Sequence, residues 1–282
     1  MNTTRTATLP ATLRLGPVHL TVSDLDRSAG FYQDSIGLRL RRREDGAAAL
    51  GAGADDLVVL HEQPGARRAG RHAGLYHYAL LYPSREELAR AVQRLAATGT
   101  PVTGASDHGV SEAIYLNDPD GNGIELYADR SRDVWPPPAA PGERVGMFTR
   151  ALDVDDLLAT VPNEPPPRHA GPGLRMGHVH LHVGDIGAAR DFYAGVLGFE
   201  PTVFSYPGAL FVAAGGYHHH VGLNTWRGEG VGPAPEGTVG LREWTIVLDP
   251  DGLAAVRERA GLDAGGTIAD PWGIPVRFVA GA

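Results

Sequence analysis

The stretch GPVHLTVSDLDRSAGFYQDSIGL at residues 16–38 occurs a second time as GHVHLHVGDIGAARDFYAGVLGF at residues 177–199. The two copies align without a gap at a constant offset of 161 residues. The identical positions of the first copy are Gly16, Val18, His19, Leu20, Val22, Asp24, Phe31, Tyr32 and Gly37. A repeat of this kind indicates that one structural unit was duplicated, with a histidine kept in the middle of its first apolar segment.

Each copy predicts a strand followed by a short helix. Apolar residues alternate with other residues over 16–22, which is the period of a half-buried strand. Asp24 stands at the position of a helix N-cap, and Phe31 and Tyr32 fall on the buried side of a helix that ends at Gly37. Three short strands are then expected at 38–45, 47–53 and 56–63.

The same order of elements restarts three more times. The second unit has a strand at 74–82, a helix at 84–98 and a hairpin at 111–130, which turns at Asp-Pro-Asp-Gly-Asn-Gly. The third unit begins at Met176 and the fourth near Leu241. The fourth unit is expected to carry a helix at 253–260 and a last pair of strands at 269–279. Prolines are dense over 131–173, so this segment is predicted to be a linker on the outer surface.

The composition is that of a globular protein with a sizeable core. Hydrophobic residues make up 43% of the 282 residues, and the formal net charge is −8. The negative charge argues against nucleic acid as a partner. The chain has no cysteine, which excludes disulfides and thiolate metal sites. No apolar run is long enough for a signal peptide or a membrane span, so a cytoplasmic protein without membrane partners is expected.

These modules resemble the vicinal oxygen chelate superfamily, which includes glyoxalase I, fosfomycin- and bleomycin-resistance proteins, and extradiol dioxygenases. The Phe-Tyr helix and the hairpin DPDGNGIELY carry the resemblance. The chain length, the four modules and the phrases GHVHLHV and YHHHVGLNTW are most similar to the catechol-2,3-dioxygenase branch. The resemblance implies an α+β fold, in which four βαβββ modules pair into two domains with cupped mixed sheets.

On this basis residues 8–130 are expected to form an N-terminal domain with the metal site, and residues 174–282 a C-terminal domain with a degenerate site. His19, on the first strand of module one, and His77, on the first strand of module two, would face one cup together with Glu125. Two imidazoles and one carboxylate form a facial triad, which suits a ferrous ion with open positions. Glu125 also lies in an apolar strand, where an unpaired carboxylate is costly.

The resemblance implies three more active-site residues around the metal. Tyr115 lies on the strand before Glu125, and His108 lies in the loop that precedes this strand. His61 ends the last strand of module one. A histidine in such a place can accept and return a proton of a catechol, and a phenol or imidazole can donate a hydrogen bond to a developing negative charge.

The second half is expected to have lost the ligand set. Alignment of the modules places Glu243 opposite His77, Arg277 opposite Glu125 and Thr267 opposite Tyr115. Arg277, at the position equivalent to the Glu125 carboxylate, would place a positive charge where a metal ion would bind. An alternative is a metal site in the second half, formed by His180, Glu243 and one of His218, His219 and His220. The strand that carries His180 also carries His178 and His182 on the same face.

The function expected from these residues is cleavage of a catechol by dioxygen at an extradiol position, with Fe(II) as cofactor. Mn, Zn and Ni are the alternative metals. A glyoxalase-type isomerase or lyase on the same fold is the competing enzyme, although such a site usually takes a second carboxylate. A metal-free protein that sequesters a small aromatic molecule or drug is the alternative outside enzymes. A homo-oligomer is also expected.

Overall fold

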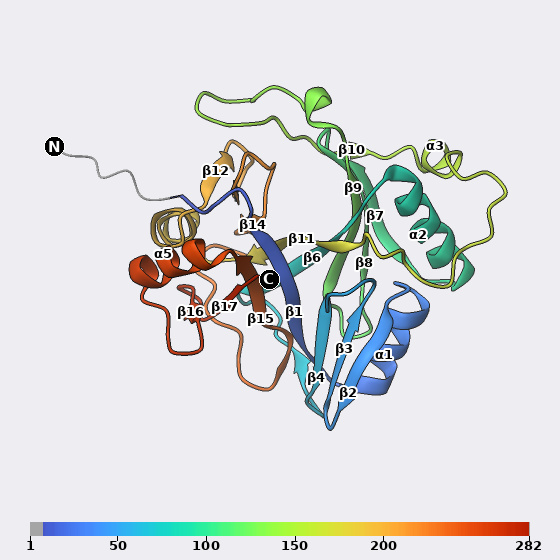
Figure 1. Ribbon diagram of the computed structural model, residues 1–282, viewed down its shortest axis with the longest axis horizontal. Coiled ribbons are helices and arrows are strands. Elements are labelled where there is room, and N and C mark those ends of the chain that lie inside the picture. The colour runs from blue at the N-terminus through green and yellow to red at the C-terminus, as the bar shows by residue number, and fades with distance from the viewer. Residues whose placement is uncertain (1–7, 282) are drawn as a thin grey trace.

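A computed structural model of the chain describes residues 8–281 (Figure 1). Residues 1–7, which belong to the segment predicted to lack a signal peptide, and residue 282, where the expected C-terminal domain ends, lie outside the described residues. Two curled mixed sheets dominate the fold, and the few helices lie on their outer sides (Figure 1). No helix within residues 8–281 is long and apolar enough to cross a membrane.

The first sheet has eight strands in the order β16-β17-β15-β1-β4-β3-β2, with β5 paired to β15. Their bounds are β1 Arg14–Val22, β2 Arg39–Glu44, β3 Ala47–Gly51, β4 Val58–Glu62, β5 Arg67–Arg68, β15 Thr238–Leu248, β16 Thr267–Ala269 and β17 Pro275–Ala280. The second sheet has nine strands in the order β10-β7-β8-β9-β6-β11-β14-β13-β12. Their bounds are β6 Gly74–Tyr82, β7 Val102–Asp107, β8 Ser111–Asn117, β9 Gly123–Asp129, β10 Arg150–Ala151, β11 Arg175–His182, β12 Glu200–Val203, β13 Ala209–Ala213 and β14 Val221–Asn224.

The helices begin at the capping residues that the sequence indicates. Their bounds are α1 Leu25–Asp34, α2 Arg85–Ala97, α3 Val154–Leu158, α4 Ile186–Arg190 and α5 Pro250–Ala260. The carboxylate of Asp24 accepts the backbone N–H of Arg27, which confirms the predicted N-cap of α1. Helix α5 begins three residues before the expected 253, because Asp249 caps it and Pro250 fits its first turn. Helix α4 continues as a π-helical segment over Asp191–Val196.

The modules do not pair as expected from the sequence. In the first sheet β1 of module one pairs with β15 of module four, and in the second sheet β6 of module two pairs with β11 of module three. Residues 8–130 and 174–282 therefore each contribute one module to each sheet. The expectation that modules one and two share a cup is wrong, because the first strand of each module finds its antiparallel partner in the other half of the chain. The repeat predicts the modules but not their partners.

The two sheets nevertheless repeat the same register. His19 lies opposite Glu243 in the first sheet, and His180 lies opposite His77 in the second. A register shift follows the duplicated histidine in both strands, after His19 and after His180. This agreement confirms that Glu243 is the counterpart of His77, as the aligned sequences predict.

The last strands agree in the same way. Glu125 pairs with Tyr115 in β8 and with Ala79 in β6. Arg277 occupies the equivalent position of the first sheet, between Thr267 in β16 and Thr245 in β15. The predicted replacement of Glu125 by Arg277 is thus confirmed. The Arg277 guanidinium lies 3.6 Å from Glu243, so an ion pair joins the two positions that would otherwise carry a metal ligand each.

The segment 131–173 does more than join the two halves. Strand β10 in this segment pairs with β7 of the second sheet, and α3 packs against α2. Leu157 and Val161 are completely buried in the main hydrophobic core. The segment connects the two halves, but Leu157 and Val161 do not lie on the outer surface that composition predicted, and two such residues are too few to show a periodic pattern.

One shared glycine of the repeat is explained by a close approach of neighbouring elements. A Cβ atom at Gly177 would lie 1.9 Å from the Tyr127 hydroxyl oxygen, and one at Gly16 would lie 3.0 Å from a Thr245 methyl carbon. A side chain at either position would push the first strand of its module away from the partner module. The glycine therefore permits the pairing on which both sheets depend.

Several histidines of β11 and of the segment before β14 are buried, which makes the fold sensitive to acid. Burial is the main cause that lowers the pKa of His220 to about 3 and that of His182 to about 4. His220 Nδ1 accepts the backbone N–H of Ala214 at 3.2 Å, an interaction that requires an unprotonated nitrogen. Both histidines are therefore neutral in the native state near neutral pH.

We predict that the protein loses stability as the pH falls from 7 to 5. The unfolded chain takes up protons at histidine near pH 6.5, whereas native His220 and His182 do not until the pH approaches their lowered pKa values. At pH 5 His220 alone costs up to about 2 kcal/mol. His220→Gln keeps an acceptor but cannot charge, so its free energy of unfolding should fall less over this range. Urea unfolding at pH 7, 6 and 5 measures the difference, and parallel curves for the two proteins would contradict it.

Candidate metal centre

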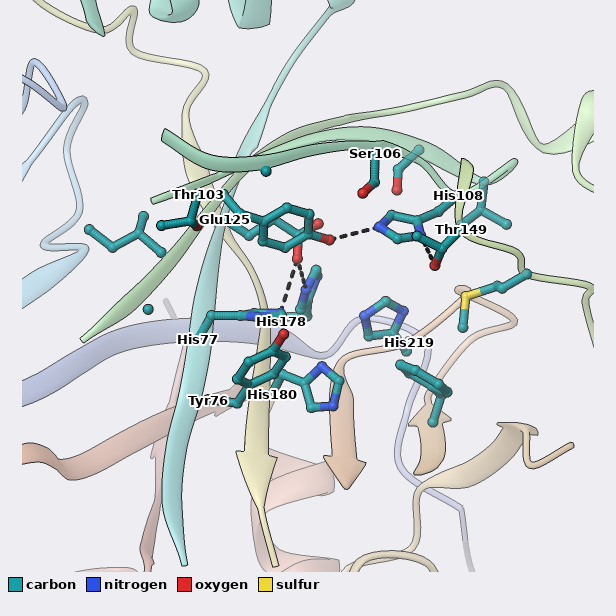
Figure 2. A pocket seen from close by; sticks show the side chains of 18 of the residues that line it. Tyr76, His77, Thr103, Ser106, His108, Glu125, Thr149, His178, His180 and His219 are labelled. Carbon is teal, nitrogen blue, oxygen red and sulfur yellow. Dashed lines mark hydrogen bonds and ion pairs between the residues drawn. The ribbon is translucent and has the colours of Figure 1, made fainter. Parts of the chain in front are cut away.

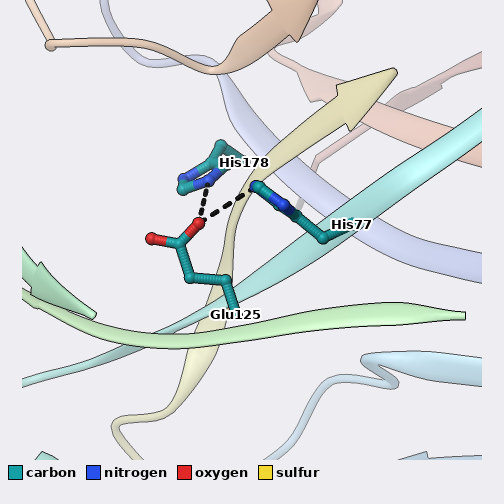
Figure 3. Close-up of side chains that lie close together, drawn as sticks. All are labelled: His77, Glu125 and His178. Carbon is teal, nitrogen blue, oxygen red and sulfur yellow. Dashed lines mark hydrogen bonds and ion pairs between the residues drawn. The ribbon is translucent and has the colours of Figure 1, made fainter. Parts of the chain in front are cut away.

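Three side chains from three adjacent strands of the second sheet converge on one point (Figure 3). Glu125 on β9 lies between His77 on β6 and His178 on β11. Its Oε2 atom is 3.0 Å from His77 Nε2 and 3.1 Å from His178 Nε2. One atom of each side chain lies within 4.8 Å of the other two, which is the spacing of ligands around a single metal ion. Two imidazoles and a carboxylate therefore form the candidate site.

The three groups are almost completely buried. Glu125 is 3% exposed, His77 5% and His178 1%. Burial by itself would raise the pKa of Glu125, but the neighbouring His178 and His77 outweigh it and hold this pKa well below its usual range. Burial lowers the pKa of His77, against the opposing effect of the Glu125 carboxylate. An ionised carboxylate and a neutral imidazole are the protonation states in which these side chains bind a metal.

The donor set fits a divalent transition metal. No hydrogen bond reaches His77 Nε2 within the described part of the chain, although the atom is buried and close to Glu125. A buried carboxylate without full compensation is also costly, and a shared cation relieves both groups at once. Two imidazole nitrogens and one carboxylate oxygen from three strands make the arrangement known from iron sites with open positions. His77, Glu125 and His178 are therefore the residues that could hold a metal.

His19, which the sequence analysis placed in this set, lies in the other sheet. Its Nδ1 atom is 3.0 Å from Nε2 of His61, the rings are stacked, and neither residue lines the cavity beside Glu125. Two of the predicted site residues thus contact each other and not the remaining four. The reason is the module pairing, since β1 and β4 belong to the first sheet and β6 and β9 to the second.

His178 is the ligand position that the repeat could not indicate. Its counterpart in the first copy is Pro17, at an offset of 161, so the position is absent from the shared residues. The repeat indicates His180 instead, because His180 is the histidine that both copies share. The signal in the sequence was the run of histidines at 178, 180 and 182 on one strand face, which only the pairing of β11 with β6 connects to Glu125.

The metal centre opens into a cavity of about 550 Å³ (Figure 2). His108 and Tyr115, which were expected near His77 and Glu125, line the same cavity as these two residues and His178. His108 Nε2 lies 2.7 Å from the Tyr115 hydroxyl, and His108 Nδ1 lies 2.9 Å from the carbonyl oxygen of Phe148. Because a carbonyl can only accept, Nδ1 of His108 carries the proton, and Nε2 of the neutral ring accepts from Tyr115. Burial and the nearby charge of Glu125 raise the pKa of Tyr115 well above its usual value.

A second chain of hydrogen bonds ends at the ring of His219, which also lines the cavity. His218 Nε2 is 2.9 Å from an Asp129 carboxylate oxygen, and His218 Nδ1 is 2.8 Å from His219 Nδ1. The carboxylate accepts from His218, so Nδ1 of a neutral His218 accepts from Nδ1–H of His219. Nε2 of His219 is then unprotonated on a ring that lines the cavity, 4.1 Å from the ring of His178. From the sequence, His219 was expected only as one possible ligand of the alternative site with His180 and Glu243.

The alternative site of His180, Glu243 and the 218–220 cluster does not form. Glu243 lies in the first sheet, opposite His19. His180 lies in the second sheet, where its Nε2 atom accepts the side-chain amide of Asn224 at 3.0 Å. Asn224 accepts in turn from His182 Nδ1 at 2.7 Å. His180 and His182 are thus held by an amide, and of the three β11 histidines only His178 joins the metal centre.

The chain belongs to the glyoxalase/bleomycin resistance protein/dioxygenase superfamily, whose family model matches residues 14–126 and 175–278. It is 44% identical over 242 residues to a catechol-2,3-dioxygenase of Bacillus subtilis, covering 83% of this chain and 82% of that protein. Among solved structures, a putative dioxygenase from Bacillus subtilis superposes with a TM-score of 0.61 at 14% identity and covers 97% of this chain and 86% of its own. Maize glyoxalase I has a TM-score of 0.56 at 19% identity, covering 95% and 92%. The two structures support the fold alone.

We predict that His178→Ala abolishes binding of a divalent metal at this centre while His19→Ala does not. Removal of a ligand should lower the affinity for the metal by more than the ~10–100-fold that loss of a hydrogen-bond partner of a ligand costs. His19 serves as the matched control, because it is a histidine on the first strand of the other sheet. Metal content after dialysis against Fe(II) or Zn(II) under anaerobic conditions measures the effect. Equal metal content in the two variants would contradict the assignment of His178.

Proposed function

We propose that the protein is an extradiol ring-cleaving dioxygenase that uses Fe(II) and dioxygen to open a catechol. The single observation that carries the proposal is the set His77, Glu125 and His178 at the floor of a cavity that also contains the His108–Tyr115 pair. The similarity to a catechol-2,3-dioxygenase over most of the chain supports the same reaction class. The metal ligands, the proton-handling groups and the space for an aromatic ring are thus on one surface.

Iron is the proposed metal because of the donor set. Two imidazoles and one carboxylate, all from one protein surface, are typical of non-haem Fe(II) sites that bind substrate and oxygen together. Fe(II) held there would supply Lewis acidity for a catechol and a route for electrons to dioxygen. The trio offers a single carboxylate, which does not favour a glyoxalase-type isomerase with two.

His219 is positioned to take a proton from a catechol hydroxyl. Its Nε2 atom carries the free lone pair, because Nδ1–H is held by His218 and Asp129 behind it. Burial is the main cause that lowers the pKa of His219 well below its usual value, so the ring is neutral and its Nε2 atom can accept a hydrogen bond from a catechol hydroxyl. The Asp129–His218 pair keeps the imidazole in this tautomer and orientation, which is the function of a supporting group behind a general base.

His108 and Tyr115 can together provide a hydrogen-bond donor in the same cavity. A neutral His108 accepts from Tyr115, as its bond to the Phe148 carbonyl requires. When His108 takes up a proton it becomes a donor at Nε2 as well, and it then donates to the Tyr115 oxygen. The Tyr115 hydroxyl can then donate its hydrogen bond to a negatively charged group in the cavity. The pair thus serves as a hydrogen-bond donor for charge that develops during ring opening.

We expect protein reconstituted anaerobically with Fe(II) to convert catechol and dioxygen to a yellow hydroxymuconic semialdehyde. Absorbance of the product and oxygen uptake in a one-to-one ratio are the measurements. The hemithioacetal of methylglyoxal and glutathione, offered to the protein loaded with Zn(II) or Ni(II), tests the isomerase reaction. Turnover of the hemithioacetal and none of catechol would reject the proposal.

We predict that His108→Ala lowers the turnover of catechol by ~10²–10⁴-fold, the usual contribution of a positioned proton-transfer group. His108 does not contact the metal ligands through a hydrogen bond, so the iron content should stay near that of the wild type. Tyr115→Phe keeps the ring and its packing, and should cost less. Iron content, melting temperature and turnover are measured on the same preparations. Full activity of iron-loaded His108→Ala would show that the residue takes no part.

A further inference from the structure

The wall of the cavity that faces away from Ser106 and Thr103 is aromatic. Tyr76 on β6 contacts Trp226 edge to face, with ring centroids 5.5 Å apart, and both contact the ring of His180. Phe211 on β13 contacts His180 and His219. This aromatic wall, defined by Tyr76, Trp226 and Phe211, extends from the buried Phe211 to the partly exposed Tyr76 and Trp226.

Two of these aromatic side chains are exposed although they are large. Tyr76 is 39% and Trp226 47% exposed, and both are among the few large hydrophobic residues at the surface of the described chain. Trp226 is nevertheless fixed, because its indole Nε1–H donates to the Pro207 carbonyl at 3.1 Å. A rigid aromatic surface that stays open to the solvent beside a reactive centre is a contact surface for an apolar part of a ligand.

The charge of the cavity is one-sided. No arginine lines it within the described residues, and the sequence contains no lysine at all. Glu125 is its one carboxylate. Arg150, which follows the lining residue Thr149, has its guanidinium over the ring of Phe148, which also lines the cavity, 4.3 Å from the ring centre. An anionic substituent of a substrate would therefore leave water without an arginine or lysine partner on the cavity wall.

The volume leaves room for a substituent. A cavity of roughly 150 Å³ already accommodates a benzene ring, and this one measures about 550 Å³. We propose that the site selects catechols that carry an uncharged apolar substituent, which lies against Tyr76 and Trp226, and rejects catechols that carry a carboxylate. The inference rests on the proposed function, since the catechol itself is assumed, and it adds the class of substituent and the residues that select it.

The test compares two substrates that share the catechol ring and a two-carbon substituent and differ in the charge of that substituent, 4-ethylcatechol and 3,4-dihydroxyphenylacetate. We expect kcat/KM to be at least about tenfold higher for the ethyl compound, because the carboxylate loses its hydration without a partner. Equal kcat/KM values, or a preference for the acid, would overturn the proposal. A strong loss of acid turnover in Arg150→Gln would also overturn it, by showing that Arg150 supplies the missing cation.

Variants locate the selection. Trp226→Ala should raise KM for 4-ethylcatechol by about tenfold more than it raises KM for unsubstituted catechol, as expected for two carbons that lose their apolar contact. Leu40→Ala, at an equally exposed hydrophobic residue of β2 in the other sheet, is the control and should alter neither. Thr103→Arg places a cation on the cavity wall and should raise kcat/KM for 3,4-dihydroxyphenylacetate. An unchanged substrate preference in both Trp226→Ala and Thr103→Arg would contradict the proposed surface.

A binding experiment separates this inference from the function on which it rests. Titration calorimetry with 4-ethylphenol and 4-hydroxyphenylacetate, which lack the second hydroxyl and are not cleaved, should show at least about tenfold tighter binding of the neutral phenol. Selective binding without cleavage of any catechol would reject the proposed reaction while supporting the apolar site. Cleavage of both catechols with equal binding of both phenols would reject the selectivity while supporting the reaction.

Discussion

The carboxylate of Glu125 is buried between two imidazoles that come from different halves of the chain. His77 and Glu125 belong to the second module and His178 to the third, and both histidine nitrogens lie close to the same carboxylate oxygen. A charge in this position is tolerated only with partners. The pairing of β6 with β11 supplies the second partner, so the metal centre forms only when the two halves of the chain fold against each other.

The same pairing explains why the described part of a duplicated chain has one candidate metal centre. Both sheets have the same register, and both place the duplicated histidine opposite the first strand of the partner module. In the second sheet the surrounding positions are His77, Glu125 and His178. In the first sheet the equivalent positions carry Glu243, Arg277 and Pro17, and the Arg277–Glu243 ion pair replaces a metal. One sheet therefore provides the chemistry and the other completes the fold around it.

The cavity combines groups that no single module contains. His108 and Tyr115 come from the second module, whereas His219 and Trp226 come from the third. The His108–Tyr115 pair and His219 thus line the same cavity as the candidate metal ligands, and each is held from behind. The Phe148 carbonyl from the connecting segment holds His108, and Asp129 from the end of β9 holds His218 and through it His219. The segment 131–173 therefore contributes to the site as well as to the connection.

The sequence by itself determined the four modules, most of their strands and helices, and four of the six predicted site residues in the cavity. Periodicity, capping residues and the DPDGNG turn are local signals that place His77, Glu125, His108 and Tyr115 within one module, and the resemblance to the vicinal oxygen chelate superfamily implied their part in the site. The choice of partner for each first strand was decided by the tertiary structure alone. The first strand of a module could pair with either of two similar modules. Its own residues do not indicate which one, because the register and the apolar faces of the two possible partners are alike. His178 therefore entered the metal centre, and His19 and His61 left it, for a reason that only the folded sheets contain.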